Sequence, residues 1–317
     1  TYEMGLKNTQ FENTSKNFTN VTFVVKEDGE LAIAKRQVIL TSGSAERVYN
    51  GEALTNGTVT VGGDGFAANE GATYNVTGSQ TDVGKSENTF TYTLKDNTKA
   101  GNYTITKELG TLKVTPIGTE VVVTITGNKV TTKYDGTAKT AEGYTVSINN
   151  DLYAEANIKF TGTAKVTETN AGTYEMGLKN TQFENTSKNF TNVTFVVEED
   201  GELAIAKRQV ILTSGSDEKV YDGQPLTNSE VTVSGDGFAA NEGAAYAVTG
   251  SQTVKGSSSN TFTYTLNDGT NKDNYTITTQ PGTLTVKPIT EKTITITANN
   301  DSKTYDGTPL TNKGYTY

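Results

Sequence analysis

The chain has 317 residues, a net charge of −9 at pH 7, and neither cysteine, histidine nor tryptophan. Without cysteine it cannot form a disulfide or a thiolate metal site, and without histidine it lacks the commonest general base. Its acidic balance argues against nucleic acid as a partner, and no apolar run is long enough to span a membrane. We therefore predict no enzymatic activity, no cofactor, no bound metal, no nucleic-acid partner and no membrane contact within these residues.

Short segments in which apolar and polar side chains alternate recur along the chain and predict β-strands. Turn sequences of the NG, DG and GDG type separate these segments, and no 12-residue stretch has helical periodicity. The clearest strand segments are TFTYTL at 89–94, VTVSG at 231–235, TLTV at 283–286 and TITIT at 293–297. The predicted fold class is all-β, built from tandem small Ig-like β-sandwich modules, with β-grasp-like modules as the alternative.

The sequence repeats with a period of 172 residues. Residues 1–44 recur as residues 173–216 with one difference, Lys26 against Glu198. The repeat is itself double, because each half has an early Tyr-Asp/Asn-Gly and a late Gly-x-Leu-x-Ile/Val-x-Lys. We therefore predict two diverged versions of one module, called A and B, in alternation.

This pattern divides the chain into five segments, two of which are incomplete modules. Both ends cut through an A module, so we expect the natural protein to continue in both directions. We also expect the cut ends to be poorly packed or to pair with a neighbouring molecule, which would be end-to-end self-association. The segments are 1–36 (C-terminal part of A), 37–116 (B), 117–208 (A), 209–288 (B) and 289–317 (N-terminal part of A).

The links between modules are short. The segment LAIAKRQVILT at 203–213 runs from one expected strand into the next without a Gly/Ser-rich linker, and Pro288 stiffens the joint that follows the second B module. Short, stiff links between small independent cores predict an elongated rod. The first partners of each module are then the neighbouring modules of the same chain.

A Tyr-Asp/Asn-Gly motif begins each module and is the candidate site, which we interpret as a structural turn. Asp or Asn is expected to bond nearby backbone, Gly to supply a positive φ, and Tyr to pack on the sheet. Asn in one copy favours a turn over an ion site that needs the acid. The candidate turn residues are Tyr49, Asn50, Gly51, Tyr134, Asp135, Gly136, Tyr221, Asp222, Gly223, Tyr305, Asp306 and Gly307.

Two other chemistries are less well supported by the residues. The carboxylate run at 198–200 has consecutive acids rather than the alternating spacing of a calcium loop, so it predicts a solvated turn. Lys219 and Asn274 are the nominal pair for an isopeptide cross-link. Arg47 stands at the position of Lys219 in the other copy, and arginine cannot form that bond.

The segments KVYDGQPLTN at 219–228 and KTYDGTPLTN at 303–312, with the closing strand GTLTVKPI at 282–289, resemble a known family. They are similar to the YDG/MBG-type tandem repeat modules of bacterial cell-surface adhesins, and the resemblance covers essentially the whole chain. It implies a secreted, extracellular protein of the bacterial cell surface, often with a distal binding region and an anchor.

The rod and the resemblance together predict a structural role. We expect a stalk or spacer of a surface adhesin or fibre that projects a distal binding region. The alternative is a multivalent array in which each module weakly binds host mucin, a glycan or a host surface protein, with avidity supplied by repetition.

Overall fold

The computed structural model describes residues 1–317, and its regular elements are strands and short 3-10 helices. The prediction of an all-β fold is confirmed. No helix is long and apolar enough to cross a membrane. The 3-10 helices are η1 (Asn8–Gln10), η2 (Ala100–Asn102), η3 (Glu155–Asn157), η4 (Asn180–Gln182) and η5 (Lys272–Asn274).

The chain divides into two compact units. Unit 1 comprises Thr1–Thr124, Val146–Thr161 and Thr181–Val196, and unit 2 comprises Ile125–Thr145, Gly162–Asn180 and Val197–Tyr317. One three-stranded sheet has the order β14-β11-β19. These strands are β11 (Val121–Gly127), β14 (Tyr144–Ile148) and β19 (Val193–Glu199).

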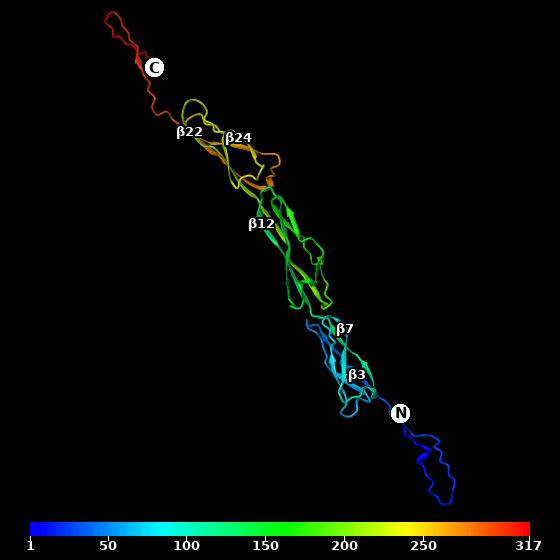
Figure 1. Ribbon diagram of the computed structural model, residues 1–317. Coiled ribbons are helices and arrows are strands. Elements are labelled where there is room, and N and C mark those ends of the chain that lie inside the picture. Colours follow the sequence, from blue (N-terminus) through cyan, green and yellow to red (C-terminus); the bar gives the residue numbers. More distant parts are fainter. The chain divides into compact units, whose positions relative to one another are not determined.

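Unit 1 contains a group of strands within residues 36–115, which includes β3 and β7 of Figure 1. The sheets of this group have the strand orders β5-β3-β9, β4-β10-β7 and β6-β8, and β15 pairs with β18 elsewhere in the unit. The strands of unit 1 are β1 (Tyr2–Glu3), β2 (Glu30–Leu31), β3 (Arg36–Ser42), β4 (Ala45–Val48), β5 (Val59–Gly63), β6 (Ala72–Val76), β7 (Gly84–Asn88), β8 (Phe90–Leu94), β9 (Tyr103–Glu108), β10 (Gly110–Thr115), β15 (Ile158–Phe160) and β18 (Phe183–Asn185).

Unit 2 contains a strand group within residues 208–287 that has the same topology, with the orders β23-β21-β27, β22-β28-β25 and β24-β26. It also contains the sheet β12-β20-β17 and the pairs β13-β16 and β29-β30. The strands of unit 2 are β12 (Lys129–Lys133), β13 (Lys139–Glu142), β16 (Lys165–Glu168), β17 (Gly172–Glu175), β20 (Glu202–Ala206), β21 (Arg208–Ser214), β22 (Asp217–Val220), β23 (Val231–Gly235), β24 (Ala244–Val248), β25 (Gly256–Asn260), β26 (Phe262–Leu266), β27 (Tyr275–Gln280), β28 (Gly282–Lys287), β29 (Thr297–Ala298) and β30 (Tyr315–Thr316).

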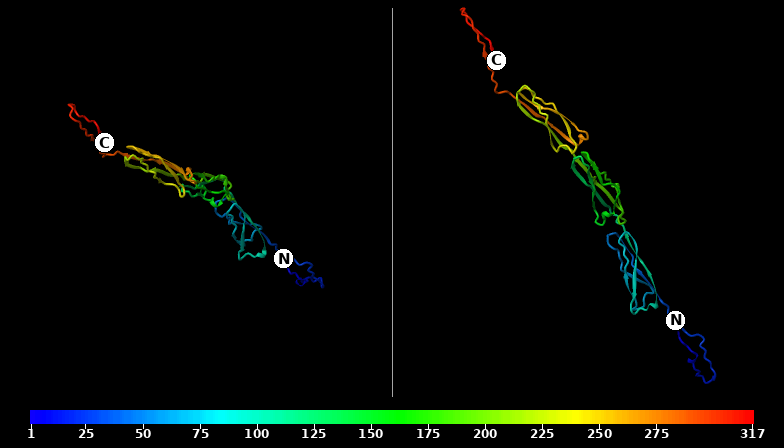
Figure 2. Two further views of the ribbon diagram at one scale, coloured as in Figure 1. Left: turned by 90° about the horizontal axis from the view of Figure 1, so that it is seen from above. Right: turned by 45° about the horizontal axis from the view of Figure 1, so that its top comes forward.

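Each three-stranded sheet of these groups combines one parallel and one antiparallel pair. In unit 2, β21 is the central strand, antiparallel to β23 and parallel to β27. Figure 2 shows from two further directions that the strands within each group lie side by side. The parallel pairs join strands that are distant in sequence, so the first two strands of the group, β21 and β22, lie next to its last two, β27 and β28.

Alternation of side chains along the central strands builds the cores. In β21, Val210 and Leu212 are fully buried, whereas Ile211 and Thr213, which alternate with them, are only half-buried. β11 follows the same rule, with Val121, Val123 and Ile125 fully buried. Thr and half-exposed Val on the opposite faces suit strands that have one solvated side.

Buried polar side chains hold the loops around each small core through hydrogen bonds to the backbone. The Asn260 amide is fully buried and donates from Nδ2 to the carbonyls of Gly215 and Asn228, at 2.8 Å each. Ser214 Oγ donates to the Asn260 carbonyl at 2.5 Å. These bonds satisfy carbonyl groups that the sheets leave unpaired, in a chain that has no disulfide to hold its loops.

Replacing this amide should loosen one strand group without affecting the other. Asn260→Ala leaves the part-buried carbonyls of Gly215 and Asn228 without their donor, which costs about 1 kcal/mol of unfolding free energy. Amide hydrogen exchange should therefore accelerate in residues 208–287 and stay unchanged in 36–115. Asn88 makes the equivalent bonds to Gly43 and Asn56. Asn88→Ala should therefore accelerate exchange in 36–115 and leave 208–287 unchanged. Equal acceleration in both groups would contradict this role.

Candidate functional site

The four Tyr-Asp/Asn-Gly motifs have one local geometry. In each, the Asp or Asn side chain accepts a hydrogen bond from the backbone N–H two residues later, at 2.9 to 3.1 Å. The glycine that follows has a φ between +79° and +84°, which only glycine adopts without strain. The motifs are Tyr49-Asn50-Gly51, Tyr134-Asp135-Gly136, Tyr221-Asp222-Gly223 and Tyr305-Asp306-Gly307.

In the copies with an aspartate, a nearby lysine forms an ion pair with the turn carboxylate. The hydrogen bond from Lys139 Nζ, 2.5 Å from Asp135 Oδ2, and the bonds from Thr137 hold the pKa of Asp135 below its usual range. Lys219 lowers the pKa of Asp222 in the same way. Asn50 forms the turn without any charge, so the hydrogen bond rather than the ion pair defines the motif.

The tyrosines of the four motifs differ in their surroundings. Tyr134 is buried, Tyr49 is half-buried, Tyr221 is partly exposed and Tyr305 is 93% exposed. Because the turns themselves are alike, the difference lies in what each ring meets beyond its own turn. Tyr134 shows the most complete arrangement.

Within unit 2, Tyr134 contacts two residues of the strand group 208–287. Its hydroxyl donates to Glu242 Oε1, and its ring meets the ring of Tyr275 edge-on, with centroids 5.7 Å apart and an interplanar angle of 85°. The Tyr275 hydroxyl donates to Glu242 Oε2 at 2.8 Å and accepts from the Ala239 N–H at 2.9 Å. The Glu242 carboxylate thus accepts one hydrogen bond from the Tyr134 hydroxyl and one from the Tyr275 hydroxyl.

The two tyrosines are held in their neutral form. Burial raises the pKa of Tyr275 to about 12, and its hydrogen bond to Glu242 adds to the rise. Burial and the Glu242 carboxylate also raise the pKa of Tyr134. A neutral hydroxyl is the form that can donate to a carboxylate, so the contact and the protonation state support each other.

Charged groups flank this contact. Lys133 Nζ lies 2.7 Å from Asp236 Oδ1, and both side chains are partly exposed. Arg208 donates from Nε to the Gly237 carbonyl at 2.8 Å and from Nη1 to the Tyr134 carbonyl at 3.3 Å. The ion pair of Lys133 with Asp236 is exposed enough to add little stability. Arg208, in contrast, donates hydrogen bonds to a carbonyl on each side of the contact.

The buried Asn274 adds hydrogen bonds to the same contact. Its Oδ1 accepts from the Ala171 N–H at 2.8 Å, and its Nδ2 donates to Asn170 Oδ1 at 3.0 Å. Within unit 2, residues 134 and 170–171 therefore contact the strand group 208–287 through specific hydrogen bonds as well as packed rings.

A related contact within unit 1 involves Tyr49. Its ring meets the buried Phe190 edge-on at 5.9 Å. Asn189 accepts from the Val83 N–H at 2.8 Å and donates to Asp82 Oδ1 at 3.0 Å. Here too, the ring of a turn tyrosine contacts a residue outside its own strand group, and the asparagine that precedes that residue bonds back to the group.

The structure gives the other candidate residues separate partners. Lys219 pairs with Asp222 at 2.8 Å, while Asn274 makes the bonds described above, so the nominal isopeptide pair is not brought together. In the carboxylate run, Asp200 accepts the N–H groups of Gly177 and Leu178. No group of three or more His, Cys, Asp or Glu is arranged to hold a metal ion.

Sequence reasoning did not identify Glu242, Tyr275 or Asn274 as contact residues. The available signal was the segment FAANEGA, which is identical at 66–72 and 238–244 and carries the carboxylate in both copies. An unchanged segment in otherwise diverging copies indicates a shared requirement, although not which residue lies opposite.

One comparison with known proteins gives a match. Residues 121–207 match the family model of the MBG domain. This range contains the Tyr134-Asp135-Gly136 turn and the strands from β11 to β20. No curated protein and no solved structure matches the chain.

The paired tyrosines predict a loss of stability in alkaline solution. Because the folded-state pKa of Tyr275 is raised from 10.0 to about 12, its contribution is full below pH 10 and is lost as the pH rises toward 12. In calorimetry over that range, the melting temperature should fall more steeply for the unsubstituted chain than for the double variant Tyr134→Phe, Tyr275→Phe. Tyr264→Phe, at an exposed ring, is the control and should keep the original slope. Equal slopes in all three chains would contradict the assignment.

Proposed function

We propose that this chain is a structural spacer, part of the stalk of a bacterial surface adhesin or fibre that projects a distal binding region. In this proposal, small β-sandwich modules are joined end to end as a rod, outside the bacterial cell. The observation that carries it is the contact in which Tyr134 and Tyr275 share the Glu242 carboxylate.

The length of the link supports a stiff joint. Strand β20 ends at Ala206 and β21 begins at Arg208, so only Lys207 separates them. A one-residue link has few conformations, and the side-chain contacts of Tyr134 and Asn274 restrict those that remain. A flexible tether would have a longer, Gly/Ser-rich link and no bonded contact across it.

The comparison and the composition support the same proposal. The MBG match at 121–207 agrees with a resemblance to repeat modules of surface adhesins. The chain is acidic, with a net charge of −9, which favours solubility and repulsion between neighbouring fibres. In this proposal the functional properties are length and stiffness, and no residue has a catalytic role.

Distance measurements between spin labels test this stiffness. The chain has no cysteine, so labels at Thr163→Cys and Ser229→Cys, both exposed and in unit 2, would be unique. A stiff joint predicts a narrow distance distribution. Adding Tyr134→Ala or Glu242→Ala should broaden it, because each removes one side of the shared hydrogen bond.

The equivalent substitution at an uninvolved turn is the control. Tyr221→Ala removes the turn tyrosine that follows Lys219, away from the labelled joint, and should leave the distribution unchanged. A distribution that is already broad in the unsubstituted chain would contradict the spacer proposal.

A further inference from the structure

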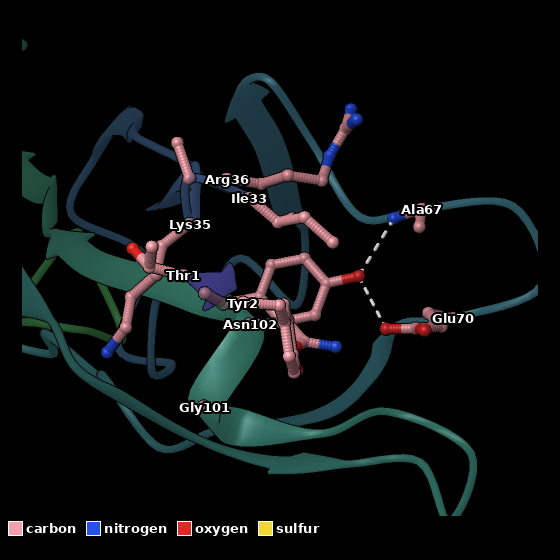
Figure 3. Close-up of a pocket in the computed structure, with 11 residues that line it drawn as sticks. Thr1, Tyr2, Ile33, Lys35, Arg36, Ala67, Glu70, Gly101 and Asn102 are labelled. Carbon is pink, nitrogen blue, oxygen red and sulfur yellow. Dashed lines mark hydrogen bonds between the residues drawn. The ribbon is translucent and has the colours of Figure 1, made fainter. Parts of the chain in front are cut away.

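The strand groups of unit 1 and unit 2 repeat each other's side-chain bonds, so a difference between them is informative. The Tyr103 hydroxyl donates to Glu70 Oε2 at 2.5 Å and accepts from the Ala67 N–H at 3.0 Å (Figure 3). The Tyr275 hydroxyl makes the same two kinds of bond, one to Glu242 and one from a backbone N–H. The charges around the Tyr-Asp/Asn-Gly turn depart from this agreement.

The turn of unit 2 contains an ion pair that the turn of unit 1 lacks. In unit 2, Lys219 Nζ lies 2.8 Å from Asp222 Oδ1. The corresponding residues of unit 1 are Arg47 and Asn50, so the cation is kept and an amide replaces the carboxylate. Arg47 Nη2 donates to the Glu52 carbonyl, but the buried Nε has no hydrogen-bond partner. A buried donor without an acceptor costs stability, and the carboxylate that could accept from it is missing at position 50.

Asn50 precedes Gly51, and this sequence allows the side-chain amide to react with the main chain. The Gly51 nitrogen attacks Asn50 Cγ and closes a succinimide ring, while the Cγ–Nδ2 bond breaks and ammonia leaves with the proton of the Gly51 amide. Glycine has no Cβ to hinder the approach of its nitrogen. Water then opens the ring at Cγ to leave an aspartate, or at the main-chain carbonyl to leave an isoaspartate. The net reaction consumes one water and releases one ammonia.

The local geometry favours this reaction at Asn50. The side chain is exposed, and Oδ1 accepts from the Glu52 N–H at 3.1 Å, a bond that spans Gly51 and draws electrons from Cγ. The leaving nitrogen is weakly held, because Nδ2 lies 3.4 Å from Glu52 Oε2. The Gly51 N–H, which must lose its proton, donates to no group of the structure.

Asn56-Gly57 has the same sequence but a different environment. Asn56 is half-buried, and its Nδ2 donates to the Ser44 carbonyl at 3.0 Å. Its Oδ1 accepts from the N–H of Thr58 at 3.0 Å and from the hydroxyl of the same residue at 2.7 Å. These bonds hold both ends of the amide, so the structure favours reaction at Asn50 over Asn56.

We propose that Asn50 is a modification site, at which deamidation without an enzyme produces an aspartate that pairs with Arg47. The turn accommodates this product, because the aspartates of the other three motifs accept the same backbone hydrogen bond. The reaction adds one negative charge to the turn of unit 1 and gives all four motifs the sequence Tyr-Asp-Gly.

The positions of the side chains support pairing of the new carboxylate with Arg47. Arg47 and Asn50 both bond to the backbone of Glu52, and they have the sequence spacing of the pair between Lys219 and Asp222. The Glu52 carboxylate is exposed and would repel a second carboxylate at position 50. The guanidinium beside both groups offsets this repulsion, so Arg47 decides whether the product is stable.

Incubation of the full chain in mildly alkaline buffer, followed by mass spectrometry of its peptides, tests the reaction. Asn50 should convert to a carboxylic acid several-fold faster than Asn56 in the folded chain, and the two should react at similar rates in urea. Asn50→Gln should abolish the conversion at this position and leave Asn56 unchanged. Equal rates at Asn50 and Asn56 in the folded chain would overturn the proposal, and so would isoaspartate as the sole product.

Thermal unfolding of the variant Asn50→Asp tests the pairing without waiting for the reaction. Its effect on the melting temperature should be more favourable in the chain that has Arg47 than in the chain with Arg47→Gln, and high salt should reduce the difference. Asn56→Asp is the matched control and should lower the melting temperature, because it removes the donor to the Ser44 carbonyl. The same change with and without Arg47 would overturn the pairing.

Discussion

Glu242 accepts a hydrogen bond from Tyr134 on one strand group and from Tyr275 on the next, and the other contacts of that region are arranged around it. A half-buried carboxylate needs donors, and two neutral hydroxyls supply them without a buried cation. Around the same contact, Arg208 donates to the Tyr134 carbonyl and Asn274 donates to Asn170. The contact therefore combines packed rings with hydrogen bonds of defined direction.

The same contact gives the turn at Tyr134 a structural role. Asp135 and Gly136 hold the chain in a tight turn at the end of a strand, which presents the adjacent tyrosine to the next strand group. Each group is small and has no disulfide, so its loops are held by buried amides such as Asn260. Each strand group thus combines a modest core with bonded contacts to neighbouring segments, as at Tyr134 and Tyr49.

Part of this structure could be predicted from the sequence. Strands such as β21 alternate in a way that any half-buried strand must, so Val210 and Leu212 could be identified as core residues. The burial and contacts of the turn tyrosine could not be predicted, because Tyr134 and Tyr305 lie in equivalent motifs and only Tyr134 is buried. Its partner Glu242 lies 108 residues away, and no local pattern relates two such positions.

The most direct measurement is a double-mutant cycle between Tyr134 and Glu242, read from the unfolding free energy of the chain at neutral pH. The variants are Tyr134→Phe, Glu242→Gln and the pair together. If the shared carboxylate joins the two strand groups, the two substitutions should be coupled by on the order of 1 kcal/mol. Additive effects with no coupling would contradict the account, because they would mean that the two side chains act independently.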